Sequence, residues 1–390
     1  MLPAAAGVAG RSRAPRRDTE SMQTLTEYEW RALNGKYNLS DGHAHHSLLP
    51  WLGNEAGASL LRVANEAERI PCSDAYKRFV TTFFACGGQN QVPATAQVAL
   101  QYSASISIEI VANVLRRRAE RLGRAFRLAL LHPTFDNIPS ILCRHGIALT
   151  RVPDDPAALV DAIASEEIDG VFLVCPNNPT GTELDRKHFE KVLTTCRTRE
   201  LLLIIDFSFR WFSDYLGWSQ YAMLAESRVE FLAIEDTGKA WAALELKIGM
   251  LVYSVSMQDE VMAVQNDMLL NVSPFTLLLL ANLMACRGIV DALRDVVRDN
   301  RARLRDSLRN CAVHFSQAST LSVEWIRLPA GSNSVGLAEA LARRDVFVLP
   351  GGPFFWANPA EGQQFIRVAL LRPRDWFVSA TERLAAAWPR

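Results

Sequence analysis

Four apolar runs of strand length, separated by helical patterns, constrain the fold of this chain more than any other feature. The runs cover residues 127–132, 170–175, 201–206 and 230–235, and almost every side chain within them is apolar. Strands that are apolar throughout are typical of a parallel sheet with helices on both faces. Amphipathic helical patterns occupy the intervening segments at residues 138–145, 156–166 and 185–199. The sequence therefore predicts an α/β fold with a mostly parallel sheet.

Polar residues stand where these predicted strands end. Asn177 and Asn178 follow the second run, Asp206 ends the third, and Asp236 to Lys239 follow the fourth. In an open α/β sheet, ligands bind outside the carboxyl ends of the strands. We therefore expect the functional site at this edge of the sheet.

Composition excludes several classes of protein. Of the 390 residues, 49% are apolar and 22% are charged, which suits a globular core. The 42 basic and 42 acidic side chains give a net charge of zero, which argues against nucleic acid or a membrane surface as partner. No window approaches the roughly 18 apolar residues of a transmembrane helix. The seven cysteines lack CxxC spacing, which favours reduced thiols and a cytoplasmic protein.

The length corresponds to two or three domains. Residues 1–21 are small and basic without apolar periodicity, so we predict a disordered tail; their arginines follow a weak apolar stretch, which is not the order of a secretory signal. Residues 22–56 form an N-terminal segment with a helical pattern at 26–34. Residues 57–288 form a large domain and residues 289–390 a smaller α/β domain.

The segment Cys-Pro-Asn-Asn-Pro-Thr-Gly at residues 175–181 resembles the NPTG signature of the fold-type I aminotransferases, which depend on pyridoxal phosphate. Alone, this segment is ordinary loop punctuation. Asp206, Lys239, Lys247 and Arg367 follow in the order of the family, and with them the chain is identified as a member. The resemblance implies a seven-stranded sheet between helices in a cofactor-binding large domain, a smaller C-terminal domain, an N-terminal helical lid and a homodimer.

The resemblance gives each of these residues a role that suits its chemistry. Lys239 attaches the cofactor as an imine and moves the substrate's α-proton. Asp206, at the end of a buried strand, keeps the cofactor's ring nitrogen protonated. Lys247 lies where the family has an arginine for the phosphate, and Arg367 binds the substrate's α-carboxylate. Asn178 contacts both cofactor and substrate.

Small and hydroxyl-bearing residues precede the helical pattern at residues 106–122. Ser103, Ala104 and Ser105 would offer phosphate donors at a helix N-terminus. Helix capping also places serine at this point, so both interpretations stay open. By resemblance Phe135 stacks on the cofactor ring, and packing in the core is the alternative.

Two positions depart from ordinary aminotransferases. Members of the family have a tyrosine three residues after the aspartate, which donates to the cofactor's phenolic oxygen, and Phe209 stands here instead. One contact to the cofactor is lost, for which Ser208 or Asn178 could compensate. Lys247 provides a point charge in place of the planar fork of arginine.

With these departures, four segments resemble a narrower group, the PLP-dependent L-arginine oxidases and hydroxylases of enduracididine-type natural-product biosynthesis. They are Thr-Glu-Tyr-Glu-Trp at 26–30, Asp-Gly-His at 41–43, His-Pro-Thr-Phe-Asp-Asn-Ile at 132–138 and Ile-Glu-Asp-Thr-Gly-Lys-Ala-Trp at 234–241. The resemblance extends from Thr24 to the C-terminus. It implies a lid at residues 22–56, and oxidation of L-arginine by dioxygen to a 2-keto acid with 4-hydroxylation, without flavin, haem or metal.

The resemblance assigns the guanidinium group of arginine to Glu29 and Asp236 with Thr26, and places Asp41 among the substrate-binding residues. Carboxylates suit a guanidinium because the two groups form paired, charge-assisted hydrogen bonds. Thr-x-x-Glu before an apolar run is also a capping box, so Thr26 and Glu29 could instead cap a helix. We favour the ligand role. Asp236 could alternatively orient a cofactor contact.

His43 is implied to lie over the substrate side chain and to influence hydroxylation, because histidine can move protons near neutral pH or position a water molecule. A local role in its loop is the alternative. Asp41, His43, His45 and His46 also form a compact donor cluster, as in non-haem iron sites. Adjacent ligands at this spacing rarely complete a coordination shell, and we expect no metal.

We therefore predict a homodimeric, cytoplasmic, PLP-dependent enzyme that acts on L-arginine and dioxygen, with Lys239 and His43 as catalytic residues. An ordinary aminotransferase that uses 2-oxoglutarate, and a capreomycidine-type cyclase that acts on hydroxyarginine, are alternatives within the same cofactor class. Outside that class stand a non-haem metal oxygenase and a PLP-fold regulator without activity. The presence of Lys239 argues against the regulator.

Overall fold

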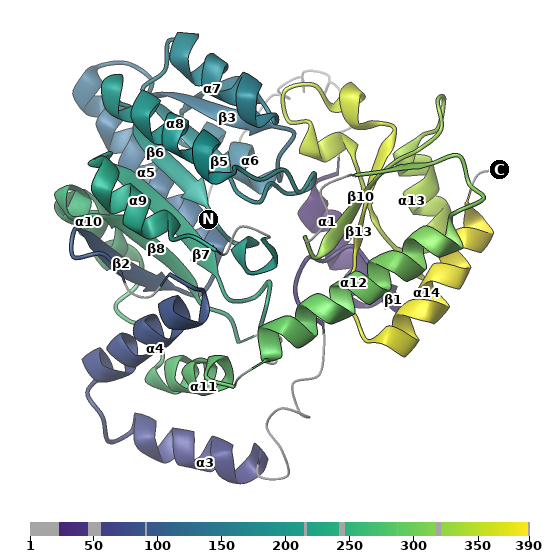
Figure 1. Cartoon of the computed structure of the whole chain (residues 1–390), viewed down its shortest axis with the longest axis horizontal. Helices are drawn as coiled ribbons and strands as arrows, with labels where there is room; N and C mark the ends of the chain where they lie inside the picture. Colours follow the sequence, from purple (N-terminus) through teal and green to yellow (C-terminus); the bar gives the residue numbers. More distant parts are fainter. Residues whose placement is uncertain are drawn as a thin grey trace, which may run out of the picture.

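A computed structural model describes residues 23–45, 56–89, 92–213, 217–241, 246–286, 288–316 and 321–388 (Figure 1). The predicted tail at residues 1–21 and His46 of the predicted donor cluster lie outside these ranges. The described residues form a large domain and a smaller C-terminal domain, which lie side by side in Figure 1.

The large domain is built on a seven-stranded sheet in the order β2 (Ala96–Gln101), β8 (Gly249–Ser254), β7 (Phe231–Asp236), β6 (Leu202–Asp206), β5 (Gly170–Val174), β3 (Arg127–His132) and β4 (Ala148–Pro153). Neighbouring strands pair in parallel except β8, which runs antiparallel to β2 and β7. Strands β5, β6 and β7 are buried along their whole length, as the apolar runs predicted. The predicted α/β fold with a mostly parallel sheet is confirmed.

Helices cover both faces of this sheet. On one face, neighbouring helices are α5 (Ala104–Leu122), α6 (Asn137–Arg144) and α10 (Gln258–Met268); on the other they are α7 (Pro156–Ser165), α8 (Arg186–Thr198) and α9 (Gln220–Ser227). Three more helices pack together near β2, namely α3 (Ala56–Ala67), α4 (Cys72–Cys86) and α11 (Pro274–Met284). Short 3-10 helices are η2 (Arg210–Phe212), η3 (Val255–Met257), η4 (Gly352–Phe354) and η5 (Pro359–Gly362).

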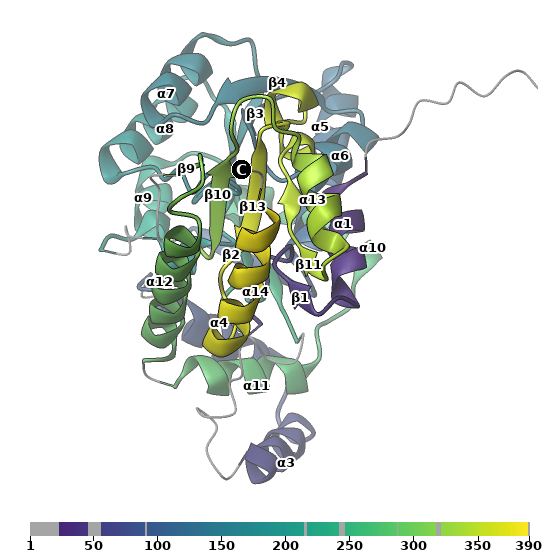
Figure 2. The same cartoon turned by 90° about the vertical axis from the view of Figure 1, so that its right-hand side faces the viewer.

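The smaller domain has an antiparallel four-stranded sheet in the order β12 (Leu349–Pro350), β13 (Phe365–Ala369), β10 (Val323–Arg327) and β9 (His314–Phe315). Beside this sheet lie α12 (Ile289–Ser307), α13 (Ser334–Ala342) and α14 (Arg374–Ala387), as Figure 2 shows.

The first described elements of the chain are built onto this smaller domain. After α1 (Leu25–Leu33), the strand β1 (Tyr37–Asn38) pairs in parallel with β11 (Val346–Phe347) (Figure 2). Leu25 and Tyr28 of α1 are buried in a cluster with Trp325, Leu349, Phe354 and Phe355. Sheet pairing and apolar packing therefore fix the described part of the predicted lid, residues 23–45, to the C-terminal domain.

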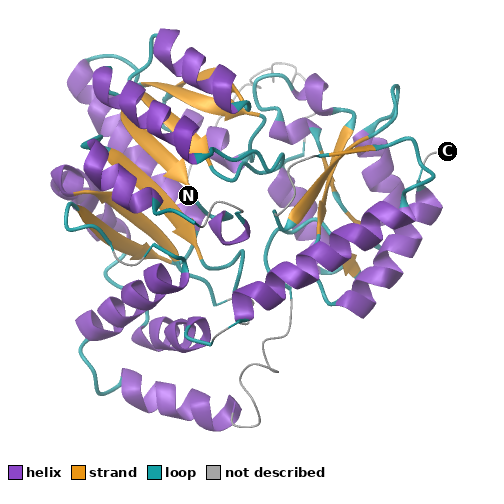
Figure 3. Ribbon diagram, in the orientation of Figure 1, coloured by secondary structure: helices purple, strands orange, loops and turns teal. Residues whose placement is uncertain are grey.

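The carboxyl ends of β6 and β7 face the smaller domain, so that residues of both domains line one pocket. Figure 3 shows that the strands form two separate groups, one in each domain. Among the described residues, no single helix has the length and apolar composition to span a membrane. Helices α11 and α12 meet that test only as a pair bent by 74°, and most side chains of α11 are buried.

Candidate active site

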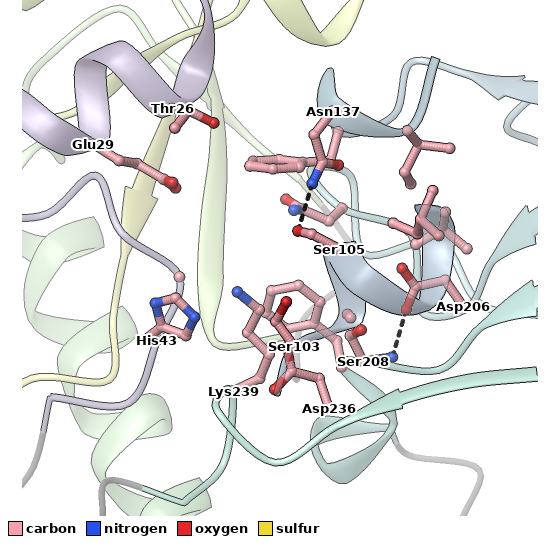
Figure 4. A pocket seen from close by; sticks show the side chains of 18 of the residues that line it. Thr26, Glu29, His43, Ser103, Ser105, Asn137, Asp206, Ser208, Asp236 and Lys239 are labelled. Atoms are coloured by element: carbon pink, nitrogen blue, oxygen red, sulfur yellow. Dashed lines mark hydrogen bonds between the residues drawn. The ribbon is translucent and has the colours of Figure 1, made fainter. Parts of the chain in front are cut away.

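A pocket of about 220 Å³ brings together nearly all of the predicted site residues. Figure 4 shows Glu29 and His43 on one side and Asp206 on the other, with Lys239 between them. Asp41 is the only predicted residue that does not line the pocket. Those that do are Thr26, Glu29, His43, Ser103, Ala104, Ser105, Phe135, Asn178, Asp206, Ser208, Asp236, Lys239, Lys247 and Arg367.

The N-terminus of α5 forms one end of the pocket. Ser103 is the N-cap residue, and its side chain accepts a hydrogen bond from the amide of Ile106 at 3.4 Å. Strand β8 approaches this helix end closely because position 249 is glycine: a Cβ there would lie 2.3 Å from the carbonyl carbon of Ser103. Lys247 also lines the pocket. Ser103 both caps the helix and lines the pocket, so an anion-binding helix N-terminus opens into the same pocket that Lys247 lines.

Asn137 lines the same region and was missed from the sequence. Its side-chain amide donates to Ser105 Oγ at 3.1 Å, shown as a dashed line in Figure 4. Asn137 is the first residue of α6 and lies within the matched segment at residues 132–138. Its place in that segment was the available signal.

Asp206 lies at the end of β6 and is buried. Its Oδ1 accepts a hydrogen bond from the amide of Ser208 at 2.8 Å. Burial raises the pKa of Asp206, while the hydrogen bond from Ser208 and the positive charge of Lys239 act in the opposite direction. The hydroxyl of Ser208 is buried and has no hydrogen-bond partner among the described residues. The site therefore offers a carboxylate that needs a cation and a hydroxyl that needs a partner, which fits a polar ring such as that of pyridoxal phosphate.

Lys239 lies between the two walls of the pocket. Its Nζ is 5.6 Å from the centroid of the Phe209 ring, the residue that replaces the family's tyrosine. A Cβ at Gly42, in the N-terminal segment, would lie 3.9 Å from Lys239 Nζ and 3.8 Å from Arg367 Nη2. The backbone of the N-terminal segment therefore reaches the centre of the pocket.

Arg367, on β13, is buried with only 1% of its surface exposed. Its Nη1 donates to Asn178 Oδ1 at 3.0 Å, and its Nη2 donates to Glu29 Oε1 at 3.3 Å and to the carbonyl of Ser40. Its guanidinium carbon is 5.7 Å from the centroid of the Phe135 ring. Phe135 thus packs against Arg367 and lines the pocket as well.

Glu29 and Thr26 do not cap α1. The capping box is formed by Thr24 and Glu27: the amide of Glu27 donates to Thr24 Oγ1 at 3.2 Å, and the amide of Thr24 donates to Glu27 Oε2 at 2.9 Å. The alternative that Thr26 and Glu29 serve as a cap is therefore wrong, and both face the pocket (Figure 4). Burial raises the pKa of Glu29, and the positive charges of Arg367 and Lys239 oppose that rise.

Asp41 lies behind His43 and holds it. His43 Nδ1 donates to Asp41 Oδ1 at 2.6 Å, and His45 Nε2 donates to Asp41 Oδ2 at 2.7 Å. Burial by itself would raise the pKa of Asp41, but these hydrogen bonds outweigh it and hold that pKa well below its usual range. In the structure Asp41 contacts the two histidines, and its role as a substrate ligand stays a prediction.

Asp236, at the end of β7, is buried and accepts a hydrogen bond from the amide of Gly238 at 2.6 Å. This bond shapes the turn that leads to Lys239, and the alternative that Asp236 orients a cofactor contact stays a prediction. Asp236 also lines the pocket, so a second role toward a ligand is compatible with its position.

A second buried arginine, Arg372, was not recognised from the sequence. It donates to three backbone carbonyls of the N-terminal segment: Nε to Asn38 at 2.7 Å, Nη2 to Asp41 at 2.6 Å and Nη1 to His43 at 2.9 Å. Because Arg372 follows β13 closely, the strand that carries Arg367 also fixes the loop that carries His43.

The loop of the NPTG signature is held by the carboxylate of Asp154. Thr182 Oγ1 donates to Asp154 Oδ2 at 3.0 Å, and Thr180 Oγ1 donates to the same oxygen. Burial raises the pKa of Asp154 to about 6. Asp154 thus anchors the loop from which Asn178 reaches Arg367.

Residues 62–374 match the family described as aminotransferase class I and II. The chain belongs to this family. It is accordingly an enzyme of the fold-type I class, and its cofactor is pyridoxal phosphate, in agreement with the predicted fold and cofactor.

Several solved and curated proteins are similar. MppP, in a structure soaked with the product 2-ketoarginine, is 32% identical with a TM-score of 0.81 over 89% of this chain and 98% of that one. LysN, the α-aminoadipate aminotransferase of Thermus thermophilus, shares the fold at 17% identity, with a TM-score of 0.76 over 94% of each chain. LL-diaminopimelate aminotransferase of Moorella thermoacetica is 23% identical over 220 residues. The aligned part is 55% of this chain and 55% of that relative, so the chain spans about half of the relative's length. Histidinol-phosphate aminotransferase of Rubrobacter xylanophilus is 26% identical over 307 residues, 75% of this chain and 81% of the relative.

Proposed function

We propose that this enzyme oxidises L-arginine with dioxygen to the 2-keto acid, with 4-hydroxylation as a further outcome. The observation that carries the proposal is the pair of Arg367 and Glu29, which face each other in the pocket at 3.3 Å. The pocket thus offers a guanidinium group for a carboxylate and a carboxylate for a guanidinium group. The similarity to MppP, soaked with its product 2-ketoarginine, supports the same class of substrate.

Pyridoxal phosphate, when bound, withdraws electrons from the α-carbon of an attached amino acid. The N-terminus of α5 and Lys247 would hold its phosphate, because both present positive charge to one end of the pocket. Asp206 would accept a hydrogen bond from its ring nitrogen, since a buried carboxylate stabilises the protonated ring. Lys239 would attach it covalently and then take the α-proton of the substrate.

Bound L-arginine would separate Arg367 from Glu29 and pair with each of them through one of its own charged ends. Arg367 would bind the α-carboxylate through its planar fork, with Asn178 fixing the orientation of that fork at 3.0 Å. Glu29, with Thr26 and Asp236, would receive the guanidinium group. Arg367 and Glu29 therefore each keep an oppositely charged partner when the substrate binds. This limits the free-energy cost of separating the buried ion pair.

The apolar ring of Phe209 removes the phenolic donor that an ordinary aminotransferase presents to its cofactor.

Oxidative deamination consumes one dioxygen and one water per arginine, and releases the 2-keto acid, ammonia and hydrogen peroxide, which accounts for the two electrons removed. A second dioxygen that removes two hydrogens from C3 and C4 and leaves as a second hydrogen peroxide, followed by addition of water at C4, would give the 4-hydroxylated product. His43 would position or deprotonate that water.

The direct test is oxygen uptake by the PLP-loaded enzyme with L-arginine, combined with mass spectrometry of the products with and without oxygen. We expect uptake above background and formation of a 2-keto acid. Background uptake would reject the proposal. Turnover under argon that requires 2-oxoglutarate would select an ordinary aminotransferase, the activity for which the curated relatives are named. Reaction with hydroxyarginine but not with arginine would select a cyclase.

We further propose a homodimer, the assembly that is typical of this fold. One chain has a mass of 43.4 kDa, and sedimentation of the PLP-loaded enzyme should give twice that mass. A monomer under conditions of full activity would contradict it.

A further inference from the structure

We propose that Lys247 is a positioning residue for His43: it holds the imidazole ring in one orientation, with Nδ1 toward Asp41 and Nε2 toward Lys247, and so joins the phosphate end of the pocket to the hydroxylation chemistry. The inference rests on the proposed function, because Nε2 of His43, the atom that would accept the proton of the water, is the atom that Lys247 contacts and has to release for that step.

Three side chains form a continuous hydrogen-bonded row. Asp41 Oδ1 and His43 Nδ1 are 2.6 Å apart, and His43 Nε2 and Lys247 Nζ are 3.2 Å apart. An ammonium group only donates hydrogen bonds and a carboxylate only accepts them. With an ammonium group on one side and a carboxylate on the other, the ring donates from Nδ1 and accepts at Nε2, which is one of its two tautomers.

The backbone leaves space for this contact at Gly238. A Cβ on Gly238 would lie 3.0 Å from His43 Cδ2 and 3.2 Å from Lys247 Cδ. Any larger residue would crowd both partners. The amide of Ala44 also donates to the carbonyl of Gly238 at 3.2 Å, which holds the His43 loop against the turn before Lys239.

Charged groups surround His43 on several sides. Asp41 and Lys247 each contact one of its ring nitrogens, Glu29 lies across the pocket, and Arg372 contacts its backbone oxygen at 2.9 Å. These contacts leave the ring little freedom to turn.

Lysine suits this double task better than the arginine that it replaces. Its ammonium group has three donors in a tetrahedral arrangement, so one can point to His43 while the others point to an anion at the α5 N-terminus. A guanidinium group directs its donors within one plane and favours bidentate pairing with phosphate. The change from arginine to Lys247 therefore links two parts of the pocket.

The first experiment is 15N NMR of histidine side chains in the cofactor-free protein, with His43 assigned from the spectrum of His43→Phe. We expect a protonated Nδ1 and a hydrogen-bonded acceptor signal at Nε2. Lys247→Arg should shift the Nε2 signal, whereas Lys191→Arg, an exposed lysine on α8, should leave it unchanged. A protonated Nε2 in the native protein, or a signal that Lys247→Arg does not move, would overturn the proposal.

The second experiment is a double-mutant cycle on PLP affinity, with His43→Phe, Lys247→Arg and their combination. If the two residues act together, the change in Kd for the double variant should differ from the product of the single changes by about threefold or more. Independent effects would contradict the coupling. NMR signals and PLP affinity do not depend on turnover. The two experiments therefore test this inference even if the enzyme takes up no oxygen with arginine.

Discussion

The two walls of the pocket are assembled in different ways. On the wall formed by the large domain, Asp206 and Lys239 follow strands of one sheet, and Ser103 begins the helix after β2. On the opposite wall, Glu29 comes from α1, His43 from a loop and Arg367 from β13. The first wall is typical of the family, whereas the second combines the beginning and the end of the chain. Under the proposed function, the first wall would hold the cofactor and the second would choose the substrate.

The largest expected effect comes from removing the amine on the first wall. Lys239→Ala should lower turnover of arginine by about 10³-fold or more, because covalent attachment and α-proton transfer are both lost. Intact mass after borohydride reduction should show a cofactor adduct in the native enzyme and none in the variant. An adduct that persists would identify another lysine as the attachment site. Lys191→Ala is the matched control.

On the second wall, Arg367→Gln should raise KM for arginine by about 100-fold, since a charge-assisted fork is lost and each tenfold corresponds to about 1.4 kcal/mol. PLP affinity should change much less, because Arg367 belongs to the substrate side. Arg374→Gln, an exposed arginine paired with Asp299, serves as control. Loss of PLP affinity with an unchanged KM would place Arg367 on the cofactor side.

Variants of Glu27 and Glu29, two carboxylates on helix α1, test whether Glu29 recognises the positive charge of the substrate. Glu29→Gln should lower kcat/KM for arginine by about 10- to 100-fold, since a charged hydrogen bond contributes roughly 1.5–3 kcal/mol, and should affect citrulline, which lacks the positive charge, much less. Glu27→Gln, whose amide can still close the capping box, should leave both values unchanged. Equal losses for both substrates would mean that Glu29 supports the fold of α1 and does not recognise charge.

The anchor of the NPTG loop should affect stability and leave substrate choice unchanged. Because burial raises the pKa of Asp154 to about 6, its contribution to stability is complete below the unfolded value near 3.8 and is lost as the pH rises through about 6. Relative to Asp154→Asn, the native protein should therefore lose stability between pH 4 and pH 7, by about 3 kcal/mol at most. Urea unfolding of both proteins at several pH values measures this difference. Parallel stability curves would contradict it.

The first wall could be predicted from local patterns, and the second could not. Apolar runs followed by polar residues located Asp206 and Lys239, because a buried strand and its end leave a clear local signature. Strand β4 was missed because it lies at the sheet edge and buries few side chains. Strand β8 was missed because its place depends on antiparallel pairing with distant segments.

Two overlapping capping-box patterns at the start of α1 illustrate the limit of local rules. Thr24 with Glu27, and Thr26 with Glu29, both have the required spacing. Burial of Leu25 and Tyr28 against the smaller domain sets the rotation of the helix, and this contact decides that Glu29 faces the pocket. Arg372 escaped detection for a similar reason, since its carbonyl partners at residues 38–43 are remote in the sequence.

The parallel pairing of β1 with β11 has a consequence for how the enzyme is made. Tyr37 pairs with Val346, about 300 residues later, so during synthesis the N-terminal segment has no partner strand until nearly the whole chain has left the ribosome. The sheet that holds the cofactor side can form before that point. A nascent enzyme would therefore gain its cofactor-binding half first, and the ability to select an amino acid only at the last stage of folding.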